Sequence, residues 1–171
     1  MKATQRDTEF TGFVAAHSGT LRHTAYLLTG HTQAAEDLLQ DALVKTWLAW
    51  SRIDPTAAWA YTRKVMVNLA TDRWRKRRYE TITMDLDDRT PSSHDGGFSE
   101  SDDRTFIVRQ LAQLSARERA AVVLRYYHDL PEVEVAQLLG CSVGTVKSTC
   151  SRALARLRSR GEAALATRSQ S

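Results

Sequence analysis

The side chains with the clearest chemistry lie near the end of the chain, in "LLGCSVGTVKSTCSRALARLR" (138–158). A helix that begins after Ser142 places Thr145, Ser148 and Arg152 along one face, because about 3.6 residues make one turn. Small hydroxyl side chains let a helix approach another surface closely, and arginine suits phosphates and base edges. An ordinary solvated face would carry more Glu and Lys, which also favour helix over Ser and Thr. The pattern therefore favours contact with DNA.

The surrounding residues complete a helix-turn-helix pattern. The opposite face of the same helix is a narrow, mostly apolar stripe of Val143, Val146, Cys150, Ala153 and Leu157. Small Ala136 suits the crossing of two helices, and Gly140 suits the turn between them. Ser142 is a candidate N-cap, which leaves first-turn N–H groups for an anion. The alternative is a tight helical hairpin with a basic, solvated outer face.

A second group of cations follows the helix that begins at Asp54 and Pro55, a natural N-cap and first-turn pair. The side of this helix away from its apolar stripe carries Arg63, Lys64, Thr71, Trp74, Arg75 and Arg78. Cations neutralise phosphates and an indole stacks on an unpaired base, so this face suits nucleic acid. The alternatives are that the cations complement the helix dipole and that Trp74 packs on a neighbouring domain.

A helix over 32–50 has the opposite character, with acidic and amide groups away from its apolar stripe. These are Glu36, Asp37, Gln40 and Asp41. The helix dipole favours acids in the first turns, so a solvated face is the default explanation for this cluster.

The sequence offers no set of residues that predicts catalysis or a metal site. Its five histidines share no motif, and no glycine-rich phosphate loop is present. Cys141 and Cys150 have no Cys or His partner at zinc spacing, so we expect reduced thiols in a cytoplasmic protein. We therefore expect no catalytic residue, no metal, no cofactor and no small-molecule substrate.

The elements that position these groups are predicted to be helical throughout. Apolar residues recur at helical spacing in both halves, and no segment shows the sustained alternation of a strand. The first half is expected to form four helices ending near Arg78. In the second half, "SARE" (115–118) is a capping box that opens a helix, and Pro131 begins a short one. The fold class is therefore all-α.

The 171 residues suffice for two small domains. We place them at 1–78 and 105–162, followed by a tail at 163–171. Between them, 79–104 is predicted to be a flexible acidic linker, since 80–103 holds eight acids against Arg89 alone. The longest apolar run, 120–124, is far short of the roughly 20 residues that span a bilayer, so we expect no membrane insertion.

Taken together, these stretches resemble the extracytoplasmic-function (ECF), or group 4, sigma factors of bacterial RNA polymerase, within the sigma-70 superfamily. The segment "AYLLTGHTQAAEDLLQDALVKTW" looks like region 2.2 and "WAYTRKVMVNLATDRWRKRR" like regions 2.3 to 2.4. The segment "LSARERAAVVLRYYHDLPEVEVAQLLGCSVGTVKSTCSRALARLRSR" looks like region 4. The first domain is thus similar to sigma region 2 and the second to sigma region 4.

The resemblance implies roles for particular residues. Core polymerase would be bound through its β′ clamp helices by Asp37, Gln40, Asp41 and Trp47, with the β flap as a further contact. The minus 10 element would be contacted by Arg63, Lys64, Asn68, Thr71, Asp72, Trp74, Arg75 and Arg78. The minus 35 element would be contacted by Thr145, Ser148, Thr149 and Arg152 at bases and by Lys147 and Arg156 at phosphates. Many members have Arg and an aliphatic residue where this chain has Thr149 and Cys150.

The function implied is that of a non-enzymatic sigma factor that binds core RNA polymerase and directs promoter-specific initiation. An anti-sigma factor is a further candidate partner. One alternative is a helix-turn-helix activator or repressor that binds duplex DNA without core polymerase, which predicts dimerisation and leaves the first half unexplained. Another is a sigma-like decoy that binds polymerase without using DNA.

Overall fold

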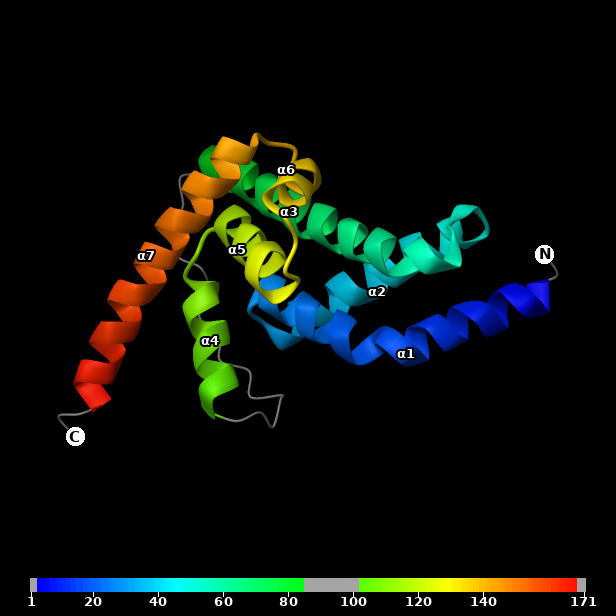
Figure 1. Cartoon of the computed structure of the whole chain (residues 1–171), viewed down its shortest axis with the longest axis horizontal. Helices are drawn as coiled ribbons and strands as arrows, with labels where there is room; N and C mark the ends of the chain where they lie inside the picture. The colour runs from blue at the N-terminus through cyan, green and yellow to red at the C-terminus, as the bar shows by residue number, and fades with distance from the viewer. Residues whose placement is uncertain (1–2, 85–101, 169–171) are drawn as a thin grey trace. The chain divides into compact units, whose positions relative to one another are not determined.

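The computed structural model describes the backbone of residues 3–84 and 102–168, with side chains over 5–73 and 106–161. All regular elements in these ranges are helical (Figure 1), which confirms the all-α prediction. Contacts divide the chain into two compact units, residues 1–95 and 96–171. Each unit is described by itself below.

Unit 1 contains α1 (Ala3–Thr29), α2 (Thr32–Ala49) and α3 (Ala58–Met84). Two 3-10 turns, η1 (Trp50–Arg52) and η2 (Pro55–Ala57), connect α2 to α3. The described part of this unit therefore has three α-helices, and the prediction of four was wrong. Residues before Gly30 form the single helix α1, which continues through Gly12 and Gly19 with no positive φ at either glycine.

The core of unit 1 lies where the three helices meet. Its fully buried members include Leu21 of α1, Leu38 of α2 and Met66 of α3. Two threonines also lie in this core: the hydroxyls of Thr46 and Thr62 are 3.2 Å apart, and each donates to a carbonyl one turn earlier in its own helix. Both polar groups are therefore satisfied away from water, and they join α2 to α3 at a fixed register.

The buried face of α3 includes Ala58, Thr62, Met66 and Val67, which are fully buried. Val65 and Leu69 are only partly buried. Helix α3 packs against both α1 and α2, and these contacts cover its buried side. Asp54 is an N-cap as predicted, but it caps the start of η2, which directly precedes α3. The Thr56 hydroxyl and backbone N–H both donate to its carboxylate, which holds the pKa of Asp54 below its usual value.

Unit 2 contains α4 (Asp102–Ala112), α5 (Ala116–Val122), α6 (Glu132–Leu139) and α7 (Val143–Arg168), with a π-helical turn η3 (Val123–Tyr127) after α5. Helix α7 packs against α4, α5 and α6. The helices reach past the predicted domain limits, since α3 continues to Met84 and α7 to Arg168. Most of the predicted linker, 85–101, lies outside the described residues.

The start of α5 joins it to α4. Ser115 and Glu118 form the predicted capping box, with Ser115 N–H donating to Glu118 Oε2 at 3.1 Å and Glu118 N–H to Ser115 Oγ at 3.3 Å. The next side chain, Arg119, is buried and donates to the backbone oxygens of Leu111, Ala112 and Leu114 at 2.9, 3.0 and 3.0 Å. Leu111 and Ala112 end α4 and Leu114 lies in the turn that follows, so Arg119 adds donors to the carbonyls at this helix end.

We expect Arg119→Met to lower the free energy of unfolding of unit 2 by about 2 kcal/mol, because three carbonyls at the end of α4 each lose a side-chain donor. Arg117→Met changes an exposed arginine two positions away and is expected to cost less than about 0.5 kcal/mol. Urea denaturation followed by circular dichroism measures both. Equal stabilities of the two variants would contradict the capping role of Arg119.

Candidate nucleic-acid interface

The turn between α6 and α7 has the geometry that the helix-turn-helix prediction requires. Gly140 ends α6 in the left-handed region, at φ 61° and ψ 45°, a conformation that suits glycine. The N–H of Cys141 then donates to the carbonyl of Ala136 at 3.0 Å. At the start of α7, Ser142 Oγ accepts the N–H of Thr145 at 3.1 Å. The turn is thus closed on both sides, and Ser142 caps α7 as predicted.

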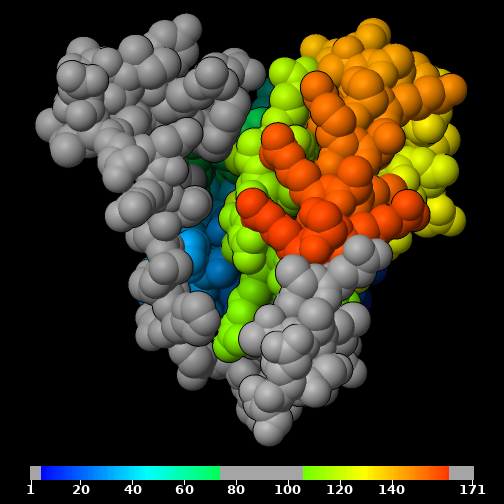
Figure 2. All heavy atoms as spheres, turned by 90° about the vertical axis from the view of Figure 1, so that its left-hand side faces the viewer, coloured from blue at the N-terminus to red at the C-terminus, as the bar shows by residue number. Residues whose placement is uncertain are grey.

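The two sides of α7 differ as the sequence pattern indicates. Val146, Cys150 and Ala153 are buried, at 1%, 5% and 0% exposure. We call the outward side the recognition face; it carries Thr145, Ser148, Arg152 and Arg156. The last three of these are exposed and Thr145 is half-buried beside Ser142. Figure 2 shows the outer surface of α7, coloured orange to red, beside α4 in green.

The structure contradicts the placement of Thr149 among residues that reach bases. Its side chain is only 6% exposed. Thr149 lies three residues after Val146 and four before Ala153, so it shares their buried side of the helix. Thr149 is thus a packing residue in this chain.

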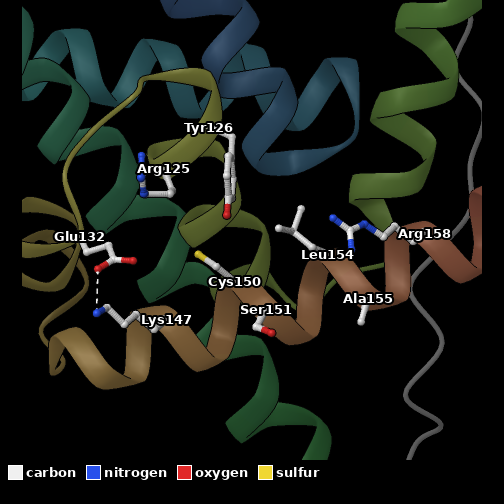
Figure 3. Close-up of a pocket in the computed structure, with 9 residues that line it drawn as sticks. All are labelled: Arg125, Tyr126, Glu132, Lys147, Cys150, Ser151, Leu154, Ala155 and Arg158. Atoms are coloured by element: carbon white, nitrogen blue, oxygen red, sulfur yellow. Dashed lines mark ion pairs between the residues drawn. The ribbon is translucent and has the colours of Figure 1, made fainter.

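Both cations that the resemblance assigns to phosphates have carboxylate partners within unit 2. Lys147 Nζ lies 3.6 Å from Glu132 of α6 (Figure 3). Arg156 Nη1 donates to both carboxylate oxygens of Glu118, at 3.1 and 3.0 Å. Sequence spacing gave no sign of either pair, because each joins residues of different helices.

A pocket of about 350 Å³ lies between α7, η3 and the start of α6 (Figure 3). Cys150 and Leu154 of α7 line it together with Arg125 and Tyr126 of η3. Burial raises the pKa of the Cys150 thiol, an effect that Arg125 partly offsets. No group of His, Cys, Asp and Glu able to hold a metal ion occurs among the residues that the structure describes.

In unit 1, α3 presents part of the predicted polar face. Lys64, Asn68 and Asp72 are exposed, and Arg63 is half-buried. The hydroxyl of Thr71 donates to backbone carbonyls of its own helix, at 2.9 Å to Val67 and 3.0 Å to Asn68. The side chains of Trp74, Arg75 and Arg78 lie outside the described residues.

Arg73 is a residue that the sequence reasoning missed. Its Nη2 pairs with Asp41 Oδ2 of α2 at 2.5 Å, with both side chains partly exposed. Arg73 begins the basic segment "RWRKRR" (73–78), which we call the arginine block, but only the packing of α2 on α3 brings it to Asp41. The pair links the acidic helix to the basic one.

The outer face of α2 is larger than its acidic residues alone. Asp37, Gln40 and Asp41 are exposed, and Val44 and Leu48 follow at helical spacing with 57% and 65% exposure. We call these five residues the α2 face. Exposed apolar groups beside acids are typical of a protein-binding surface. The spacing from Gln40 to Val44 to Leu48 was the signal that could have found them.

Trp47 is held mainly by α1. The Arg6 guanidinium lies 4.0 Å from the centre of its ring, the ring of Phe10 lies 5.1 Å away, and Arg6 Nη2 donates to the Trp47 carbonyl. The side chain is half-buried. The structure therefore packs Trp47 at the edge of the α2 face, beneath α1.

Two family models match the chain: sigma-70 region 2 over residues 13–79 and sigma-70 region 4 over residues 107–157. The RNA polymerase sigma-E factor of Streptomyces avermitilis is 41% identical over 152 residues, which cover 88% of this chain and 83% of the relative. The chain belongs to the ECF family of sigma-70 RNA polymerase sigma factors. The ECF sigma factor SigL of Mycobacterium tuberculosis is 34% identical over 148 residues, which cover 83% of this chain and 82% of SigL.

Solved structures agree with the family and the fold. The sigma factor RpoE of Bartonella quintana, solved with the anti-sigma factor NepR, matches with a TM-score of 0.65 at 28% identity, covering 88% of this chain and 94% of that one. CnrH, solved with the cytosolic domain of CnrY, shares the fold with a TM-score of 0.61 at 24% identity, covering 90% and 88%.

The family match confirms the resemblance read from the three sequence segments. This ECF sigma factor directs promoter recognition and has no catalytic activity of its own. The match over residues 13–79 accounts for the half of the chain that a simple helix-turn-helix regulator left unexplained. In the described part of the chain, no helix combines the length and apolarity needed to cross a bilayer.

Alkylation of the two cysteines tests the placement of α7. The raised pKa of Cys150 means less thiolate at a given pH than an ordinary thiol holds, and burial also blocks the reagent. We expect iodoacetamide at pH 8 to modify half-buried Cys141 at least ten times faster than Cys150 in the folded protein. Peptide mass spectrometry measures the two rates. Equal rates without denaturant would contradict a buried Cys150.

Proposed function

We propose that this sigma factor binds core RNA polymerase through the α2 face, contacts the minus 10 element through α3, and reads the minus 35 element through α7. The observation that supports this assignment of contacts to three helices is the recognition face of α7. It exposes a small hydroxyl group, Ser148, and a guanidinium, Arg152, on a helix whose opposite side is buried and whose first turn is capped. A helix held in this way can enter a major groove.

The α2 face suits the β′ clamp helices of the polymerase. Its carboxylates would meet basic groups of the partner, while Val44 and Leu48 would lose their exposed apolar surface to the contact. Trp47 supports this face by fixing α1 against α2. Asp41 has a partner already in Arg73, so polymerase binding through Asp41 would exchange one cation for another.

On α3, the exposed side chains of Lys64, Asn68 and Asp72 would contact the minus 10 element, with Arg63 and Thr71 beside them. Trp74, Arg75 and Arg78 continue this surface in the sequence, where an indole can stack on a base that has left the duplex. Arg73 adds a cation to the same block. The chemistry of this surface suits DNA that is being melted.

On α7, Arg152 and Ser148 would meet base edges, with Thr145 at the groove floor. Lys147 and Arg156 would meet phosphates, while Thr149 contributes packing. Unit 2 would also meet the β flap of the polymerase. Two weak DNA contacts suffice, because tethering both units to one polymerase makes the second contact effectively intramolecular.

We also propose that the protein works in the cytoplasm, where core polymerase and promoter DNA are found, and that an anti-sigma factor regulates it. Support for the regulator comes from the similar sigma factor RpoE, which was solved with the anti-sigma factor NepR.

Co-elution with core RNA polymerase on size exclusion tests the α2 face. We expect the purified protein to co-elute, and Asp37→Asn with Gln40→Ala to weaken the complex at least tenfold, because both side chains are exposed on that face. Asp7→Asn, which removes an exposed acid from α1, is expected to leave the complex unchanged. Unchanged co-elution of the double variant would argue against this docking surface.

Promoter selection by the reconstituted holoenzyme tests α7. Arg152→Gln is expected to weaken binding to the minus 35 element by one to two orders of magnitude, since a good base contact contributes about 1–3 kcal/mol. Core binding is expected to persist. Arg109→Gln removes an exposed arginine of α4 and serves as the matched control. Unchanged promoter choice in Arg152→Gln would favour the decoy over the promoter-reading function.

A further inference from the structure

We propose that Glu118 is a positioning residue that holds the Arg156 guanidinium ready for a phosphate of the minus 35 element. The inference deepens the proposed function of α7 and rests on it. It assigns a role in DNA binding to a carboxylate that does not touch DNA. That carboxylate belongs to α5, not to the recognition helix itself.

The geometry keeps Arg156 oriented and still accessible. A single nitrogen, Nη1, donates to both oxygens of Glu118, at 3.1 and 3.0 Å. The arginine side chain nevertheless remains 57% exposed, while the Glu118 side chain is 11% exposed. Because a guanidinium carries five N–H donors in a rigid planar fork, fixing one nitrogen orients the others.

Glu118 can fix an orientation because it is itself immobile. Its Oε2 accepts the N–H of Ser115, and its own N–H donates to Ser115 Oγ. Its neighbour Arg119 is buried and bonds to the last carbonyls of α4. Contacts at the junction of α4 and α5 therefore hold the Glu118 carboxylate in place, and this carboxylate in turn orients Arg156 of α7.

Arg156 lies where an oriented cation is useful. It follows Arg152 by four residues and Ser148 by eight, so the three share the recognition face. An arginine that is ordered before binding loses less side-chain freedom when it meets a phosphate. Competition between the carboxylate and a phosphate is the opposite possibility, but the largely buried Glu118 leaves most of the guanidinium uncovered.

The substitution Glu118→Gln separates positioning from capping. Glutamine serves the third position of a capping box as well as glutamate does, so the start of α5 stays capped while Arg156 loses its charged partner. We expect holoenzyme carrying Glu118→Gln to bind a promoter duplex with a minus 35 element about 3- to 10-fold more weakly. Thermal unfolding of the free protein is expected to stay within two degrees of the parent.

A double-substitution cycle shows whether Glu118 acts through Arg156. Arg156→Gln is expected to weaken promoter binding at least as much as Glu118→Gln does. The variant with both changes is expected to bind no more weakly than Arg156→Gln alone. Additive losses would overturn the proposal. So would unchanged binding in Glu118→Gln, which would leave Glu118 as a cap only, or tighter binding, which would make it a competitor.

If Glu118→Gln unfolds at a lower temperature than the parent, Arg156→Lys tests the same contact by changing its exposed partner instead. Lysine keeps the charge but lacks the planar fork. A loss close to that of Arg156→Gln supports a held guanidinium, and full retention of binding overturns it. Arg152→Gln in the same assay separates the function proposed for α7 from the role proposed for Glu118. If Arg152→Gln and Glu118→Gln both leave promoter binding intact, the function proposed for α7 fails. If Arg152→Gln weakens binding and Glu118→Gln does not, only the role of Glu118 fails.

Discussion

The packing of α7 onto its three neighbours is the constraint on which unit 2 depends. Val146, Cys150 and Ala153 form a narrow buried stripe, and small side chains there let α7 approach α5 and α6 closely. Once that stripe is buried, the rotation of the helix is fixed. Every outward side chain, from Ser148 to Arg156, then has a determined direction. Recognition of DNA by this helix is thus a consequence of what its other side buries.

Ends of helices, more than their middles, connect the elements of this protein. Arg119 supplies donors to the last carbonyls of α4, Glu118 closes the first turn of α5, and Gly140 lets the chain turn into α7. Small helical domains have little apolar surface to bury. Hydrogen bonds to the backbone groups at helix ends therefore do much to fix the positions of their helices. One of these residues, Glu118, also contacts the recognition face through Arg156.

Ion pairs between helices give partners to cations that look free in the sequence. Lys147, Arg156 and Arg73 read as free cations in a list of residues, yet each has a carboxylate opposite it in the fold. The more exposed pairs, at Arg73 and Lys147, contribute little to stability, about 0–1 kcal/mol each. Their effect is on binding, because they set how many cations are available and in which direction they point. A modest affinity for DNA follows, which suits a protein that acts when bound to polymerase.

The sequence by itself determined the helical class, the capping box at Ser115, the turn at Gly140 and the two-sided character of α7, because these follow from local periodicity and backbone preference. Three segments in order also indicated the sigma family. Tertiary structure alone decided that α1 is one helix, that Thr149 is buried, that Trp47 packs under Arg6, and that Arg73 and Arg156 meet acids of other helices. Those outcomes depend on contacts between residues far apart in the chain, which helical spacing does not encode.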